Sequence, residues 1–131
     1  MSKILIADDD DHYRTLIEKI LKEAGHQIIS ASDGDLAWKK IQEESPDMAV
    51  LDVNMPGKNG FELCKLIRST PKFKNMPVLI LTVLSETDKQ VKGYDLGADD
   101  YVPKPFNSQV LVARVRKLEQ RILGKRSSQG S

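Results

Sequence analysis

Four short hydrophobic runs organise this chain, and each one leads into a polar residue that can do chemistry. The runs span 4–7, 48–51, 78–81 and 101–103, and they lead into Asp8 and Asp9, Asp52, Thr82 and Lys104. Uninterrupted apolar runs of this length are typical of strands that are buried on both faces of a parallel sheet. The pattern therefore predicts four strands, and a short segment early in the chain is predicted as a fifth. They cover 3–7, 27–31, 48–52, 78–82 and 100–103.

The segments between these strands carry apolar residues at spacings of three and four, which predicts helices. The predicted helices cover 11–24, the stretch around 36–41 that ends before Ser45, 60–69, 86–97, and a last segment that has Asn107 as its N-cap. Strand and helix alternate along the whole chain, so we predict an α/β fold with a parallel sheet and helices on both faces. Right-handed crossovers limit this alternation to a doubly wound sheet.

The polar residues at the strand ends are expected to meet. In an open parallel sheet, ligands bind at the carboxyl ends of the strands, so three carboxylates, a hydroxyl and an ammonium should lie at one edge. Neighbouring carboxylates repel one another unless a cation neutralises them. Oxygen ligands favour Mg²⁺, with Mn²⁺ as the alternative, over zinc. We assign this metal role to Asp8 and Asp9, and expect Asp10 and Asp11 to cap the next helix or to be solvated.

Asp52 is the candidate nucleophile at this edge. A carboxylate after a strand can be a polar strand end, a metal ligand, or a nucleophile that attacks phosphorus and becomes an aspartyl phosphate. Thr82 could donate its hydroxyl to a phosphoryl oxygen, and Lys104 offers a mobile positive charge suited to phosphate. Pro105, which follows, can hold a cis peptide bond. The sequence contains neither a P-loop motif nor the Gly-x-Gly-x-x-Gly motif of dinucleotide-binding folds.

Size and composition narrow the class of protein. The chain has 131 residues, of which 40% are hydrophobic and 30% charged, and its net charge is +1. These values fit one globular domain without a general attraction to nucleic acid or membranes. Its single cysteine, Cys64, is predicted to be a packing residue and fits a reducing cytoplasm. No apolar stretch approaches the ~20 residues of a membrane span, and we expect no signal peptide, so we predict a cytoplasmic protein.

Four segments together carry a highly specific pattern. They are Ile4 to Asp10, Leu51 to Pro56 with Gly60, Val78 to Thr82, and Gly97 to Phe106. In this order they resemble the receiver domain of two-component response regulators, over residues 3 to about 122. The resemblance implies a flavodoxin-like sheet with strand order 2-1-3-4-5, and a signalling switch rather than an enzyme.

The resemblance also implies roles for the strand-end residues. Asp52 would accept a phosphoryl group from the phosphohistidine of a histidine kinase or of a phosphotransfer protein. Thr82 and Lys104 would contact the phosphoryl oxygens. The groups around Mg²⁺ would be Asp9, Asp52, the backbone carbonyl of Asn54, and Asp8 through a metal-bound water.

The implied switch lies beside this site. Thr82 would move on phosphorylation and Tyr101 would rotate inward behind it, which shifts the population between two packings. The surface that changes would comprise the predicted helix over 86–97, the strand over 100–103 and the last helix. It would control an output domain C-terminal to the chain, a separate partner, or a homodimer. The sequence leaves open whether the receiver stands alone or belongs to a longer regulator.

Two positions depart from the family pattern. Val83 stands where a small residue is usual, and crowding there would alter the lifetime of the phosphoryl group. We therefore expect a Val83→Ala change to alter the dephosphorylation rate. Val110 stands where receivers of the winged-helix transcription class commonly have an acid that is used in dimerisation. Asp100 and Arg114, another pair used in that dimer face, are present.

The last helix has two interpretations. Its apolar residues recur at spacings of four, three and four, which fits packing on the sheet or a coiled coil that extends beyond the domain. These residues are Leu111, Val115, Leu118 and Ile122. Residues 1–123 are predicted to form the receiver domain and 124–131 a polar tail or linker. Glu119 interrupts the basic residues of the helix, so we predict no direct binding of nucleic acid.

Two other functions stay open at the level of sequence. A small phosphatase of the haloacid dehalogenase type would use Asp8, Asp10 and the acidic pair at 99–100 around Mg²⁺, but it would leave Asp52 without a role. A degenerate receiver would serve only as a structural partner. If the protein is a receiver, kinase recognition is expected on the first helix and after the last strand. The residues predicted for it are Tyr13, Arg14, Ile17 and Asn107.

Overall fold

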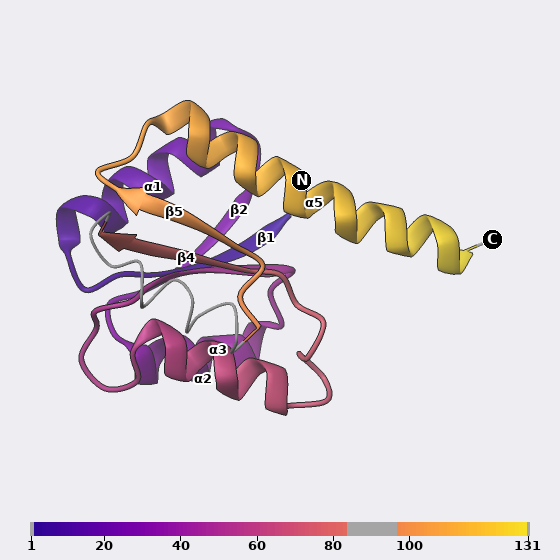
Figure 1. The fold of residues 1–131 in the computed structure, drawn as a ribbon, viewed down its shortest axis with the longest axis horizontal. Coiled ribbons are helices and arrows are strands. Elements are labelled where there is room, and N and C mark those ends of the chain that lie inside the picture. The colour runs from indigo at the N-terminus through magenta and orange to yellow at the C-terminus, as the bar shows by residue number, and fades with distance from the viewer. Residues whose placement is uncertain (1, 84–96, 131) are drawn as a thin grey trace.

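Five parallel strands form a single sheet in the order β2-β1-β3-β4-β5 (Figure 1). The structure is a computed structural model that describes the backbone of residues 2–83 and 97–130 and the side chains of residues 2–82 and 97–123. The strands are β1 (Lys3–Ala7), β2 (Gln27–Ala31), β3 (Met48–Asp52), β4 (Val78–Val83) and β5 (Asp100–Lys104). The described helices are α1 (Asp11–Glu23), α2 (Gly34–Glu44), α3 (Gly60–Ser69) and α5 (Ser108–Gly130). The predicted fold class and strand order are confirmed.

The sheet is covered on both faces. Helices α1 and α5 lie on one side of it and α2 and α3 on the other (Figure 1). Successive residues of a strand point to opposite faces, so Ile4 and Ile6 of β1 pack in the cluster under α1 and α5. Leu5 and Ala7 pack in the cluster under α2 and α3. This two-sided burial explains why the strands appear in the sequence as unbroken apolar runs.

The predicted bounds of the strands and helices agree closely with the structure, and short polar side chains mark the helix starts. β4 and β5 are each one residue longer than predicted, and α1 ends one residue earlier. Asp10, Asp33 and Asn59 are the N-caps of α1, α2 and α3, and each accepts a hydrogen bond from a backbone amide of the first turn. At α5, Asn107 Oδ1 accepts from the Gln109 amide at 2.7 Å, as predicted for its cap.

Helix α5 follows one of the two interpretations left open by the sequence, and it is longer than predicted. Leu118 is 2% exposed and belongs to the core with Leu111 and Val115, so it packs on the domain instead of starting a projecting coiled coil. The backbone stays helical to Gly130, where the sequence predicted a tail without regular structure. The reason is that the segment contains no proline to stop it. Its last turns extend past the body of the domain in Figure 1. The division at residue 123 stays a prediction.

Arg68, in the last turn of α3, joins the amino-terminal ends of β4 and β5. Its Nε donates to the Gly97 carbonyl at 2.9 Å, its Nη1 to the Met76 carbonyl at 2.6 Å, and its Nη2 to Asp99 Oδ2 at 2.7 Å. The same Asp99 oxygen accepts from the Val78 amide at 2.8 Å. One guanidinium thus fixes α3, the loop before β4 and the turn before β5 against each other.

Other predictions concern single positions. Cys64 is buried, as predicted for a packing residue, and burial raises the pKa of its thiol to about 11. The helix predicted over 86–97 and the side chain of Val83 lie outside the residues that the structure describes. In the part of the chain that is described, no helix is long and apolar enough to cross a membrane.

Candidate functional site

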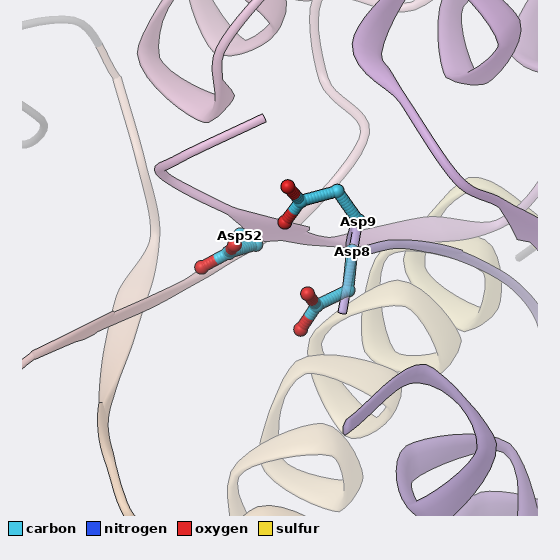
Figure 2. A group of neighbouring side chains, drawn as sticks. All are labelled: Asp8, Asp9 and Asp52. Atoms are coloured by element: carbon cyan, nitrogen blue, oxygen red, sulfur yellow. The ribbon is translucent and has the colours of Figure 1, made fainter. Parts of the chain in front are cut away.

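Three carboxylates lie together at the carboxyl ends of two neighbouring strands (Figure 2). Asp8 and Asp9 follow β1 and Asp52 ends β3, and β1 and β3 are paired so that Ala7 lies opposite Leu51. One carboxylate oxygen from each aspartate lies within 4.8 Å of the others. Asp8 and Asp52 are buried, whereas Asp9 is exposed. Like charges this close disfavour joint ionisation unless a cation offsets them, so the cluster suits a hard divalent cation with oxygen ligands.

The ammonium of Lys104 reaches the same cluster from β5. Its Nζ lies 2.9 Å from Asp8 Oδ2 and 3.2 Å from Asp52 Oδ1. Burial lowers the pKa of the amine, but hydrogen bonds and charge attraction from Asp8 and Asp52 outweigh it, so the net pKa is raised. Lys104 is therefore cationic, and its one positive charge contacts two of the three carboxylates. The peptide bond between Lys104 and Pro105 is cis, as the sequence allowed.

Asp52 has an unusual affinity for protons. Burial and the charge of Asp8 raise the pKa of its carboxyl to about 6, against the opposing effect of Lys104. At neutral pH about nine-tenths of such a group is still ionised. Its position therefore leaves a carboxylate that is poorly solvated and close to a cation. These are properties of a usable nucleophile.

The register of the sheet places Thr82 near the carboxylate cluster. Asp52 lies opposite Leu81 of β4, and the Val53 amide donates to the Leu81 carbonyl at 3.1 Å. Thr82 is the next residue along, and its side chain is 2% exposed. On the neighbouring strand, Tyr101 lies opposite Ile80, and its ring is buried in the core under α2 and α3. Thr82 and Tyr101 thus lie on adjacent strands, Thr82 next to the residue opposite Asp52, and Tyr101 near the amino end of β5 with its ring in the core.

The loop between β3 and α3 is held against the start of α2. The Gly34 amide donates to the Pro56 carbonyl at 3.1 Å, and Lys58 Nζ lies 2.7 Å from Asp35 Oδ1. A Cβ atom on Gly34 would lie 1.7 Å from the Lys58 carbonyl oxygen, so only glycine permits this approach. The loop carries Asn54, which is exposed, and the role of its backbone carbonyl as a metal ligand stays a prediction.

Two contacts of α1 with the site were not predictable from the sequence, and one residue of α1 lies elsewhere than predicted. Arg14 Nη1 donates to the Asp8 carbonyl at 2.8 Å, which anchors the backbone that carries the acidic pair. The ring of Tyr13 lies against Lys104 Nζ, 4.4 Å from its centroid. Ile17 is fully buried, so the prediction that it contacts a kinase is wrong: its helical spacing points it to the core. No sequence signal could have revealed the first two contacts, because they join residues without a shared period.

The geometry does not support the phosphatase alternative. That mechanism needs the acidic pair at 99–100 near Asp8, but the pair lies at the amino end of β5, whereas Lys104 is at the carboxyl end. Asp99 pairs there with Arg68, and Asp100 pairs with Arg114 at 2.7 Å. These aspartates therefore serve as ion-pair partners away from the carboxylate cluster.

Comparison with known proteins gives a consistent result. The family described as "Response regulator receiver domain" matches residues 4–116. The transcriptional regulatory protein AfsQ1 of Streptomyces coelicolor is 40% identical over 131 residues, which is all of this chain and 56% of that protein. The alkaline phosphatase synthesis transcriptional regulatory protein PhoP of Bacillus subtilis is 42% identical over 91% of this chain and 49% of its own length. The chain thus spans about half the length of these curated relatives.

Among solved structures, the chemotaxis response regulator CheY4 of Vibrio cholerae superimposes with a TM-score of 0.85 at 34% identity. This match covers 90% of the present chain and 98% of that one. The fold is therefore shared with a protein of similar length as well as with one part of longer regulators.

Proposed function

The chain belongs to the family of response regulator receiver domains, and from this premise we propose that it is a phosphoryl-accepting switch of a two-component system. The observation that carries the proposal is the cluster at the sheet edge, where Asp8, Asp9 and Asp52 surround a space that Lys104 enters. A hydrophobic core has no use for such a group of charges, whereas a phosphoryl acceptor site requires it. We do not assign the chain turnover of its own beyond loss of this phosphoryl group.

The proposed step is an in-line transfer to Asp52. A carboxylate oxygen of Asp52 attacks the phosphorus of a phosphohistidine on a histidine kinase or phosphotransfer protein. The new P–O bond forms as the P–N bond breaks, and the imidazole keeps the electron pair and takes up a proton from solvent. Lys104 and Thr82 bind the phosphoryl oxygens, Lys104 by charge and Thr82 through its hydroxyl. Hydrolysis of the aspartyl phosphate returns the starting carboxylate.

The acidic residues fit a divalent cation. Asp8, Asp9 and Asp52 offer oxygen atoms within 4.8 Å of one another, and Lys104 offsets only part of their charge. Together with the backbone carbonyl of Asn54 they would hold Mg²⁺, with Mn²⁺ as the alternative. When bound, the cation neutralises carboxylate and phosphoryl oxygens that would otherwise repel.

The proposed output runs through the neighbouring strands. Thr82 and Tyr101 are the switch residues, and the surface of β5 and α5, with the helix predicted over 86–97, carries the change. The partner is an output domain C-terminal to the chain, a separate protein, or a second copy. Arg114 pairs with Asp100 within one chain, so a homodimer that used this pair would have to exchange partners. We propose no contact with membranes or nucleic acid, and a cytoplasmic location, which the buried Cys64 favours.

Intact mass after phosphorylation tests the proposal. The protein is incubated with acetyl phosphate and Mg²⁺, quenched rapidly and weighed. We expect a single added phosphoryl group, absent from Asp52→Ala and from samples treated with a chelator. Glu43→Gln, a change at an exposed residue of α2, is the matched control and should keep the adduct. An adduct that persists in Asp52→Ala would refute Asp52 as the acceptor, and no adduct at any quench time would refute phosphoryl acceptance from this donor.

A further inference from the structure

The ammonium of Lys104 has an aromatic neighbour as well as two carboxylates. Its Nζ lies 4.4 Å from the centroid of the Tyr13 ring, while Asp8 and Asp52 oxygens lie at 2.9 and 3.2 Å. The lysine side chain is only 11% exposed. A cation over the face of an aromatic ring is attracted by the ring quadrupole, and more strongly where water is scarce. The ring therefore supplies one side of the pocket that holds this charge.

The fold fixes the Tyr13 ring from two directions. Asp10 caps α1 by accepting from the Tyr13 amide at 3.0 Å, which sets the first turn of the helix. The ring packs at 5.9 Å from that of Phe106, in the loop that follows Lys104, and at 5.9 Å from that of His12. The segments that carry the cation and the ring are thus held together by contacts that do not involve the charge itself.

We propose that Tyr13 is a positioning residue for phosphoryl acceptance, whose ring holds the Lys104 ammonium beside Asp52 before the phosphodonor arrives. The inference rests on the proposed function. Lysine has a long flexible stem and its ammonium can adopt many positions, so a fixed neighbour limits where the charge waits. Preorganised charge lowers the barrier to a step in which negative charge develops, because no reorganisation is needed during the reaction.

This role differs from kinase recognition, which the sequence suggested for Tyr13. A recognition residue matters only when a protein donor is used, whereas a positioning residue matters with any donor. A leucine at position 13 would keep an apolar contact with Phe106 but would remove the ring face from Lys104. A phenylalanine would keep the ring face and lose only the hydroxyl.

The first test measures phosphorylation by acetyl phosphate, which involves no kinase surface. Rates at saturating Mg²⁺ are compared for the wild type, Tyr13→Leu, Tyr13→Phe and His12→Leu. We expect Tyr13→Leu to lower the limiting rate about threefold to tenfold with little change in half-saturating donor concentration. Tyr13→Phe should recover most of the rate. His12→Leu should match the wild type, since leucine keeps an apolar contact with the Tyr13 ring and His12 does not touch Lys104 among the contacts of the described residues. Thermal melts of all variants show whether each one folds.

The second test detects the contact without phosphorylation. The ring current of Tyr13 should shift the ε-methylene protons of Lys104 upfield in NMR spectra of the wild type and Tyr13→Phe, and this shift should vanish in Tyr13→Leu. Equal rates for Tyr13→Leu and the wild type would overturn the proposal, and so would a Tyr13→Phe variant as slow as Tyr13→Leu. If no variant gains a phosphoryl group, the proposed function itself fails, and the NMR shift then reports the contact alone.

Discussion

At the scale of single residues, Asp52 must satisfy two opposing requirements. A nucleophile must be ionised, but burial and the charge of Asp8 favour its neutral form and raise the pKa to about 6. Lys104 recovers part of this cost through its contact with Asp52 at 3.2 Å. The site therefore holds a carboxylate that is costly for folding, a common feature of residues kept for chemistry.

This cost predicts a pH-dependent gain of stability for Asp52→Asn. The raised pKa means that the stabilising contribution of the protonated carboxyl is complete below the ordinary value of 3.8 and is lost as the pH rises through about 6. Asparagine keeps the shape without the charge. In metal-free urea titrations, we expect the free energy of unfolding of Asp52→Asn to exceed that of the wild type by about 1 kcal/mol more near pH 8 than near pH 5.

The control for this prediction is Glu43→Gln, which removes an exposed charge of α2 far from the cluster. Its effect should be small and should not change between the two pH values. An Asp52→Asn gain of the same size at both pH values would show that charge repulsion is not its source.

Residue roles were predictable from the sequence only where a general rule connects a residue's position in the sequence with its location in the fold. Strand ends meet at one sheet edge, and this rule brought Asp8, Asp52 and Lys104 together. The approach of Tyr13 to Lys104 depends on how α1 and the loop after β5 pack, and a helical period alone cannot give that. For Ile17 the helical period already indicated the core, and the prediction of a kinase contact failed because a place on a helix near the site does not imply exposure.

At the scale of elements, the loop after β3 depends on the first residue of α2. In the sequence, Gly34 follows Asp33, and this pair is typical of a turn but gives no hint of a second role. In the structure its missing side chain admits the Lys58 carbonyl, and the neighbouring Asp35 holds the Lys58 ammonium at 2.7 Å. A contact between segments more than 20 residues apart in the sequence leaves no periodic trace, so it could not be predicted.

Gly34→Ala separates local propensity from this tertiary contact. Alanine favours a helix over glycine by about 1 kcal/mol, so propensity alone predicts stabilisation. The added Cβ would instead lie 1.7 Å from a backbone oxygen, and overpacking of this kind is expected to cost about 2–3 kcal/mol in urea unfolding. Asp35→Ala, which removes only the exposed ion pair, should change the stability by less than ~0.5 kcal/mol. A stabilised Gly34→Ala protein would contradict the close approach.

The guanidinium of Arg68 is a second inter-element contact with a testable cost. Lysine at this position keeps the charge but cannot donate at once to the carbonyls of Gly97 and Met76 and to Asp99. We expect Arg68→Lys to lower the free energy of unfolding by about 1–3 kcal/mol. Arg121→Lys is the matched control, because Arg121 reaches Asp99 with a single nitrogen at 3.0 Å and is half exposed. Equal decreases in the free energy of unfolding of both variants would show that the several hydrogen bonds of Arg68 add no extra stability.

At the scale of the whole molecule, the alternation of strand and helix determined the fold class before any contact was known. Each strand is buried on both faces, so its apolar run is continuous, and parallel strands need helical crossovers. The length of the last helix was harder to predict. Residues after 123 are small, polar or basic, which suggested a tail, but they contain no proline to stop the helix that starts at Ser108.

Two truncations test where the folded domain ends. Leu118 is 2% exposed in the core, and Glu119 Oε2 accepts from Ser2 Oγ at 2.5 Å, which links α5 to the amino terminus. A chain that ends at Leu123 keeps both contacts and should melt within about 2 °C of the full chain. A chain that ends at Arg116 loses both and should melt at least roughly 10 °C lower. A large loss for the longer truncated chain would move the domain boundary beyond residue 123.

Because α5 is a continuous helix, its length determines the orientation of any module joined to its end. A helix turns by about 100° and advances about 1.5 Å for each residue. Any module joined to the end of this helix would therefore face a different direction with every residue added or removed, while seven residues would restore nearly the same facing at a greater reach. In fusions to this chain, natural or engineered, the activity of the joined module would depend on the direction in which it faces as much as on its distance.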